Sequence, residues 1–144
     1  MNLYICGRLR DTTVRDVAEL LREEGHDVFD DWHAAHPDAD DKWREYEIRR
    51  GRSYADVVGG DSAFRECVRD FDFGYLNRAD AIVIVGGLRT STAIEMGYIQ
   101  GRNSMAQLRE QKIYWLLPDD PERWDFMTTG IIVRSVAELV EKLR

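Results

Sequence analysis

The hydrophobic and polar positions along the chain predict short buried strands separated by amphipathic helices. The run from Ala81 to Val85 is uncharged and mostly β-branched, which indicates burial on both faces, as in a parallel sheet covered by helices. Gly86 and Gly87 end this strand. Similar short apolar runs predict four further strands, at Leu3 to Cys6, Asp27 to Phe29, Ile113 to Leu117 and Ile131 to Val133.

Apolar residues at helical spacing occupy segments between these strands. The first predicted helix has Thr12 or Thr13 as its N-cap and Gly25 as its C-terminal stop. Its expected core positions are Val14, Val17, Ala18, Leu20 and Leu21. We expect further helices from about Ser62 to Asn77, from about Thr92 to Gly101, and at the C-terminus through Val136, Leu139, Val140 and Leu143.

The alternation of strands and helices predicts an α/β fold, with an open, doubly wound parallel sheet of about five strands and helices on both faces. In such a sheet, ligands bind beyond the C-terminal strand ends, at the point where the strand order reverses. We therefore expect the functional site at the loops that follow Cys6 and Val85.

Residues 30–61 interrupt this pattern and carry no strand signal. From Asp27 to Glu47 the chain has eight acidic and two basic residues, and tryptophans and tyrosines are interleaved with them. A structureless loop of this length within a compact domain is usually either functional or mis-assigned. We expect an acidic, aromatic insertion that is partly helical and forms a lid or an oligomer contact.

Length and composition exclude several classes of protein. A chain of 144 residues is the size of one domain, which we place over residues 1–144, and its 44% hydrophobic content excludes a disordered tail. No uncharged run is long enough for a membrane helix. The formal charge of -7 repels a polyanion, so we expect no long nucleic acid as partner, whereas a single nucleotide is compatible.

The cysteines and the N-terminal residues indicate the compartment. Cys6 and Cys67 cannot by themselves form a disulfide framework or a zinc site. The N-terminus has no basic stretch followed by a long apolar segment, so we expect no signal peptide. We therefore expect a cytoplasmic protein with reduced thiols and no membrane association.

The segment after the central predicted strand, Gly86 to Tyr98, places hydroxyls and a carboxylate beside the expected crevice. Thr92 and Glu95 have the spacing of a capping box, which would satisfy free amides at a helix start. Alternatively, Glu95 faces a ligand at the helix N-terminus, where the dipole favours its ionised form and keeps it a competent nucleophile. Spacing alone leaves both interpretations open.

A second candidate carboxylate, Asp72, lies near the end of the helix that leads into the central strand. The helix dipole disfavours a carboxylate there, which suggests a role other than stability, although a solvent-facing acid is the alternative. We expect Asp80 to cap the turn into the strand.

The loop after the first strand is the third candidate element. Gly7 allows a ligand to approach the backbone, and Arg8 and Arg10 beside a helix start could accept a phosphate, unless they are simply solvated. The loop has neither the P-loop nor the dinucleotide-binding pattern. His33 and His36 lack a third firm ligand, so we expect no metal.

Taken together, these elements resemble the nucleoside 2-deoxyribosyltransferase-like superfamily, which includes the 2'-deoxynucleoside 5'-phosphate N-hydrolases. The resemblance rests on Tyr4-Ile5-Cys6-Gly7, on Asp72 with Leu76 and Ala79-Asp80, and on Thr92-Ala93-Ile94-Glu95-Met96-Gly97-Tyr98. It implies a flavodoxin-like fold and a homodimer or larger homo-oligomer. It also implies cleavage or transfer at the N-glycosidic bond of a (deoxy)nucleoside or its 5'-monophosphate, without a metal or organic cofactor.

The superfamily's pattern assigns roles to three residues. Glu95 would be the nucleophile that attacks C1' and forms a glycosyl-enzyme, Asp72 would assist protonation of the leaving base, and Tyr4 would orient the Glu95 carboxylate. Two carboxylates suit this chemistry, and a retaining pair needs a separation of about 5 Å.

Our candidate substrate-binding residues are Gly7, Arg10, Arg89, Ser91, Thr92, Tyr98 and Met127. Arg10, Arg89 and Ser91 are the candidates for a phosphate. The loop from Gly86 to Thr90 departs from the pattern of the phosphate hydrolases, and residues 135–144 look like an ordinary amphipathic helix. An NAD-cleaving glycohydrolase and a non-catalytic nucleotide-sensing module are the alternative functions.

Overall fold

One five-stranded parallel sheet forms the centre of the molecule. The computed structural model describes residues 1–7, 12–30, 73–87, 90–105, 108–117 and 130–144. The strands are β1 (Asn2–Cys6), β2 (Asp27–Phe29), β3 (Ala81–Val85), β4 (Lys112–Leu116) and β5 (Ile131–Val133). Their order in the sheet is β2-β1-β3-β4-β5, which is the flavodoxin-like order. The predicted fold class is confirmed, with β1 and β4 each beginning one residue earlier than expected.

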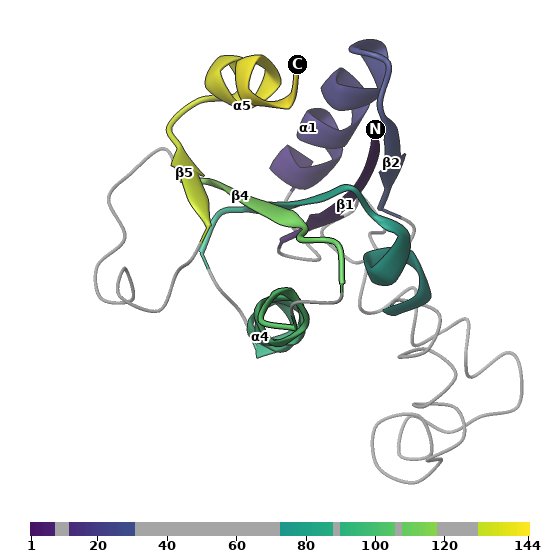
Figure 1. Cartoon of the computed structure of the whole chain (residues 1–144). Coiled ribbons are helices and arrows are strands. Elements are labelled where there is room, and N and C mark those ends of the chain that lie inside the picture. Colours follow the sequence, from purple (N-terminus) through teal and green to yellow (C-terminus); the bar gives the residue numbers. More distant parts are fainter. Residues whose placement is uncertain (8–11, 31–72, 88–89, 106–107, 118–129) are drawn as a thin grey trace, which may run out of the picture.

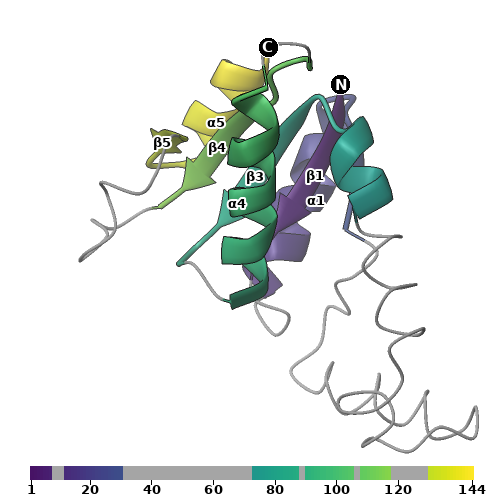
Figure 2. The ribbon, with the colours of Figure 1, turned by 60° about the horizontal axis from the view of Figure 1, so that its bottom comes forward.

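Helices cover both faces of this sheet. Helices α1 (Thr12–Glu23) and α5 (Val136–Leu143) lie on one face, and α4 (Thr90–Asn103) lies on the other, together with the helical residues 73–78 (Figure 1, Figure 2). Gly25 follows α1 with a positive φ of 88°, as a C-terminal stop requires. Helix α4 begins and ends two residues beyond the predicted bounds, and residues 62–72 of the helix expected before β3 lie outside the described residues.

Alternation along the strands divides the core into two layers. Because successive side chains of a strand point to opposite faces, β1 places Leu3 and Ile5 in the layer beneath α1 and α5. Tyr4 and Cys6 point into the opposite layer, which contains Met96 of α4. All five positions of β3 are buried, as its uncharged run predicted. The expectation for Leu20 was wrong, since its side chain is 37% exposed on the outer side of α1.

Side-chain hydrogen bonds satisfy backbone N–H groups at the start of α5 and at the start of β1. Ser135 is the N-cap of α5, and its side chain accepts from the backbone N–H of Glu138 at 3.1 Å. A carboxylate oxygen of Glu138 accepts in turn from the N–H of Arg134 at 2.8 Å. Asp80 accepts from the N–H of Asn2 at 2.8 Å and donates its own N–H to the carbonyl of Asn2 at 2.6 Å, so it joins the start of β1 to the entry of β3.

Candidate active site

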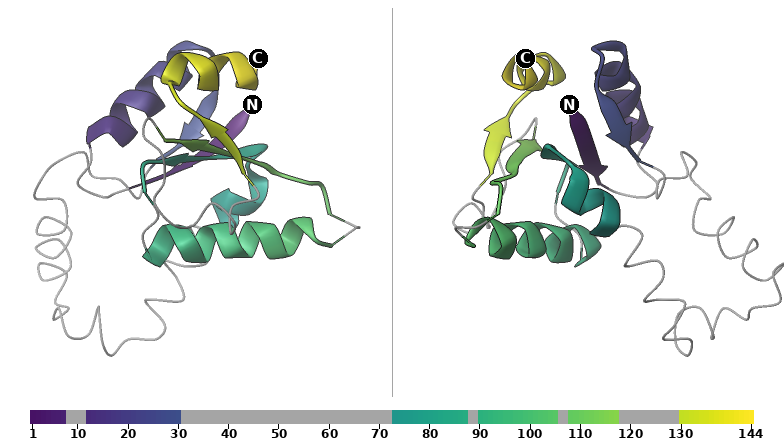
Figure 3. Two further views of the ribbon diagram at one scale, coloured as in Figure 1. Left: turned by 90° about the vertical axis from the view of Figure 1, so that its left-hand side faces the viewer. Right: turned by 45° about the vertical axis from the view of Figure 1, so that its right-hand side comes forward.

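The candidate site lies where the strand order reverses, at the C-terminal ends of β1 and β3. These strands are neighbours, with Cys6 opposite Ile84 in the register. Helix α4 follows β3 and runs back along the sheet, beneath it in the left-hand view of Figure 3. Residues in the second turn of α4 are thereby brought over the side chains of β1. The expected position of the site at this edge agrees with the topology.

Two hydrogen bonds hold the loop between β3 and α4. The indole Nε1 of Trp115 donates to the carbonyl of Gly86 at 2.7 Å, and the N–H of Gly86 donates to the carbonyl of Leu116 at 3.0 Å. Gly86 has a positive φ of 77°, a conformation that glycine adopts without strain. The end of β3 is thus fixed by β4 before α4 begins.

Tyr4 and Glu95, which are 91 positions apart in the sequence, form a hydrogen bond. The hydroxyl of Tyr4 donates to Oε1 of Glu95 at 3.0 Å. The tyrosine is fully buried and the glutamate is half-buried, so the carboxylate lies at the boundary between the core and the surface. A donor to a carboxylate favours its ionised form. The Tyr4 hydroxyl therefore holds one oxygen of the Glu95 carboxylate at the edge of the sheet.

The capping-box interpretation of Thr92 and Glu95 is wrong. Helix α4 begins at Thr90, so Thr92 is its third residue and cannot be the N-cap. The Thr92 side chain is instead buried, with 1% exposed. Glu95 is in the second turn, and the effect of the helix dipole falls off within the first turn. The Glu95 carboxylate therefore lies beyond the reach of the helix terminus and accepts a hydrogen bond from the Tyr4 hydroxyl instead.

Cys6 is a second β1 side chain in the layer that lies beneath α4. Its thiol is 2% exposed and points to the same strand face as Tyr4. Burial, followed by the negative charge of Glu95, raises the pKa of the Cys6 thiol well above its usual range. From the sequence we treated Cys6 only as a reduced, buried cysteine. Its spacing of two from Tyr4 is the signal that places both on one face.

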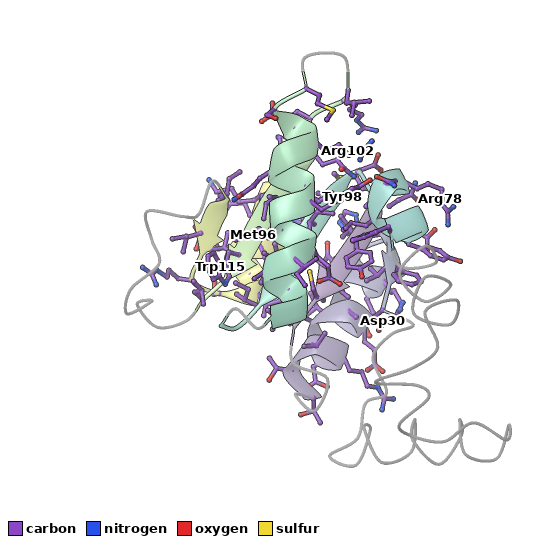
Figure 4. The ribbon with its side chains drawn as sticks, turned by 90° about the horizontal axis from the view of Figure 1, so that it is seen from below. Asp30, Arg78, Met96, Tyr98, Arg102 and Trp115 are labelled. Carbon is purple, nitrogen blue, oxygen red and sulfur yellow. The ribbon has the colours of Figure 1, made fainter. Side chains whose placement is uncertain are left out.

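Tyr98 links α4 to the helix of residues 73–78. Its hydroxyl donates to Oδ1 of Asn77 at 2.8 Å, and its ring stacks on Phe73 with 4.6 Å between centroids. In Figure 4, Met96 and Trp115 lie to one side of α4, and Tyr98 lies to the other side, toward Arg78. Tyr98 is 37% exposed, so part of it is accessible to a ligand.

An aromatic row that the sequence did not predict extends from Tyr4 through Phe29 of β2 to the helical residues 73–78. The ring of Tyr4 stacks on Phe29, with centroids 5.4 Å apart, and Phe29 stacks on Tyr75 at 3.8 Å. The guanidinium of Arg78 lies 4.4 Å above the ring of Tyr75. This row supports Tyr4, because its ring stacks on Phe29 of β2, and Phe29 in turn stacks on Tyr75 of the helical residues 73–78.

Packing accounts for Gly7. A Cβ atom at this position would lie 2.6 Å from Cγ2 of Val14 and 3.0 Å from the carbonyl oxygen of Val85. The glycine therefore allows β1, α1 and β3 to pack closely at the site edge. The ligand approach that we expected at Gly7 is not needed to explain it and stays a prediction.

The remaining candidates are placed only in part. Ser91 lies in the first turn of α4. Outside the described residues are Arg8, Arg10, His33, His36, Asp72, Arg89, Met127 and residues 31–61 of the insertion. Within the described part of the chain, no three His, Cys, Asp or Glu side chains are grouped so that they could hold a metal ion. No helix there is long and apolar enough to cross a membrane.

Comparison with known proteins gives a match in structure only. No family model matches the chain, and no curated protein matches it. The chain is similar to the solved structure of a 2-deoxyribosyltransferase from the psychrotolerant bacterium Bacillus psychrosaccharolyticus, with a TM-score of 0.58 and 18% sequence identity. The match covers 97% of this chain and 90% of that one. The chain therefore has a 2-deoxyribosyltransferase-like fold, as the resemblance of its sequence motifs implied.

Proposed function

We propose that this protein cleaves or transfers at the N-glycosidic bond of a (deoxy)nucleoside or its 5'-monophosphate, with Glu95 as the nucleophile. The observation that carries the proposal is the hydrogen bond of 3.0 Å from the buried Tyr4 hydroxyl to the half-buried Glu95 carboxylate. This pair lies at the strand-order reversal, where ligands bind in sheets of this type. The similar fold of a 2-deoxyribosyltransferase supports the same class of reaction.

In this mechanism, a Glu95 oxygen attacks C1' of the sugar while the bond from C1' to the base nitrogen breaks. The base leaves with the bonding electrons and takes a proton from Asp72. Water or a second base then attacks C1' of the glycosyl ester, gives its proton to the Asp72 carboxylate, and releases Glu95 as the C1'–oxygen ester bond breaks. Tyr4 orients the carboxylate throughout.

The assignment of Asp72 draws support from its neighbour in the sequence. Phe73, the next residue, stacks on Tyr98, which lies three residues after Glu95 on α4. Two carboxylates about 5 Å apart would give retention at C1'. We assign the phosphate of a monophosphate substrate to Arg10, Arg89 and Ser91. The rest of the substrate is assigned to Gly7, Thr92, Tyr98 and Met127, and the active form to a homodimer or larger homo-oligomer without a metal or organic cofactor.

Incubation with a panel of nucleosides, deoxynucleosides, their 5'-monophosphates and NAD, followed by chromatography of the free base, tests this proposal. We expect base release from at least one nucleoside or monophosphate, and a decrease of about 10³-fold or more in Glu95→Gln. The matched control is Glu23→Gln, an exposed carboxylate at the end of α1.

Three outcomes would contradict the proposal. Absence of base release across the whole panel would refute the proposed reaction. Wild-type activity in Glu95→Gln would refute the assignment of Glu95 as the nucleophile. Release of nicotinamide from NAD alone points to a glycohydrolase instead. Thermal stabilisation by a nucleotide that yields no product and survives Glu95→Gln indicates a binding module.

A further inference from the structure

The ring of Tyr4 stacks on Phe29, the last residue of β2. The two residues are partners in the parallel register, and both are buried in the layer that contains Met96 of α4. Their ring centroids lie 5.4 Å apart, with an angle of 27° between the planes. Phe29 also stacks on Tyr75, at 3.8 Å and 13°. The Tyr4 ring therefore packs against a ring that is itself enclosed.

The place of the Tyr4 hydroxyl depends on the tilt of this ring. The hydroxyl oxygen lies on the axis through Cβ and Cγ, so rotation of the ring about that axis does not move it. A swing of the ring out of its own plane moves the oxygen furthest, because the oxygen is at the end of the side chain. A stacked neighbour opposes this swing, and the hydrogen bond of 3.0 Å to Glu95 starts from that oxygen.

We propose that Phe29 is a positioning residue, whose ring holds Tyr4 at the tilt from which its hydroxyl reaches Glu95. This inference rests on the proposed function, in which the Tyr4 hydroxyl orients the nucleophile. The Phe29 side chain has no polar atom and acts through Tyr4. A misplacement of about 1 Å can cost about 10²-fold in rate, so a ring that prevents a small tilt has a measurable effect.

The same stack has a purely structural explanation. Phe29 precedes residues 31–72 in the chain and Tyr75 follows them, so their contact also joins the two ends of this segment. Bringing distant parts of a chain together costs conformational entropy, which a stacked aromatic pair helps to offset. A role of this kind changes the stability of the protein but not the rate of the folded enzyme. Rate and stability measured together distinguish the two roles.

Kinetics of Phe29→Leu test the positioning role, with Val28→Ala as the matched control. Leucine is apolar but has no ring face, so we expect kcat to fall about 5- to 20-fold while KM changes less than about 2-fold. Phe29→Tyr keeps the ring and should retain most of kcat. Val28 is the preceding residue of β2 and is buried in the opposite layer, so Val28→Ala should lower the unfolding midpoint and keep the wild-type kcat.

A double-mutant cycle with Tyr4→Phe shows whether Phe29 acts through the Tyr4 hydroxyl. In the Tyr4→Phe background this hydroxyl is gone, so Phe29→Leu should change kcat by less than about 2-fold. Equal losses of kcat in both backgrounds would overturn the proposal. A Phe29→Leu enzyme with wild-type kcat and only a lower unfolding midpoint would overturn it as well. If Phe29→Leu does not fold, Phe29→Met, which also lacks a ring, takes its place in the cycle.

An NMR titration of the Glu95 carboxyl carbon tests the same contact without turnover. Its resonance is identified as the one that is lost in Glu95→Gln. Because a donor favours the ionised carboxylate, the titration midpoint should move to higher pH in Tyr4→Phe, and by a smaller amount in Phe29→Leu. Val28→Ala should leave it unchanged.

This titration separates failure of the positioning role from failure of the proposed function. If no substrate of the panel is turned over, the proposed function fails. A midpoint that stays at the wild-type value in Phe29→Leu overturns the positioning role, whereas a shift to higher pH supports it with or without turnover.

Discussion

Replacing Gly7 with alanine tests whether the close approach of β1, α1 and β3 requires a glycine. The added Cβ would lie 2.6 Å from Cγ2 of Val14 and 3.0 Å from the carbonyl oxygen of Val85. Carbon atoms in proteins normally stay about 3.5–4.0 Å apart. Val14 is fully buried and the Val85 oxygen belongs to the backbone of the central strand, so neither neighbour can move freely.

The expected magnitude follows from two opposing effects. Overpacking of a core costs about 1–3 kcal/mol, whereas alanine in place of glycine gains about 0.4–1 kcal/mol by restricting the unfolded chain. We expect the free energy of unfolding to fall by about 1–2 kcal/mol in Gly7→Ala. With a urea m-value of about 2 kcal/mol/M, the unfolding midpoint falls by about 0.5–1 M, which tryptophan fluorescence can follow.

The matched control is Gly101→Ala, inside α4. A Cβ at Gly101 meets nothing within 4 Å, so this change should raise the free energy of unfolding by about 0.5–1 kcal/mol. An unfolding midpoint of Gly7→Ala at or above that of the wild type would refute the packing explanation. A ligand contact would then be the remaining reason for glycine at position 7.

Two further substitutions test the hydrogen bonds of Tyr4 and Asp80. Tyr4→Phe keeps the ring that stacks on Phe29 but removes the hydroxyl, so kcat/KM should fall about 10- to 100-fold while the free energy of unfolding changes by about 1 kcal/mol or less. The backbone N–H of Asn2, and after it Arg109, lowers the pKa of Asp80, and this contribution to stability is present above the unfolded value of about 3.9. It is lost as the pH falls through the folded pKa, so Asp80→Asn should flatten the decrease in melting temperature below about pH 4.

For each of these two substitutions, one outcome would contradict the prediction. Wild-type kcat/KM in Tyr4→Phe would show that the hydroxyl does not contribute to the reaction. Tyr114→Phe is its control, because the Tyr114 hydroxyl donates to the carbonyl of Lys142 in the opposite layer. For Asp80→Asn, a melting temperature that falls with acid as steeply as in the wild type would refute the assignment.

Most of the fold could be predicted because buried strands and amphipathic helices each produce a recognisable pattern in neighbouring residues. The uncharged run at β3 and the apolar periodicity of α1 and α5 each depend on a few adjacent residues. The start of α4 could not be predicted in this way. The same spacing of a hydroxyl and a glutamate occurs at Thr92 and at Ser135, and only Ser135 is an N-cap. The hydrogen bond between Tyr4 and Glu95 is a tertiary contact, and the local sequence pattern does not contain it.

The candidate site also combines features that the sequence predicted with contacts that depend on the tertiary structure. The position of the site followed from strand order, and the resemblance paired Tyr4 with Glu95. Alternation places Cys6 on the same face as Tyr4, but the sequence does not say which helix covers that face. The row of Phe29 and Tyr75 was missed because it joins segments that are 46 positions apart in the sequence. The roles of Asp72 and the phosphate-binding candidates stay predictions.

The two-sided burial of β1 has a consequence for engineering this protein. Leu3 and Ile5 support the layer of α1 and α5, whereas Tyr4 and Cys6 face Glu95 from the other layer. Core redesign on the α1 side can therefore raise thermal stability without altering the groups that contact the carboxylate. When stability limits such a redesign, Tyr4 and Cys6 should stay unchanged. Only residues of the layer beneath α1 and α5 should then be varied. Within this strand of five residues, positions that support the α1 layer alternate with positions that face the candidate site, so the two sets can be varied separately.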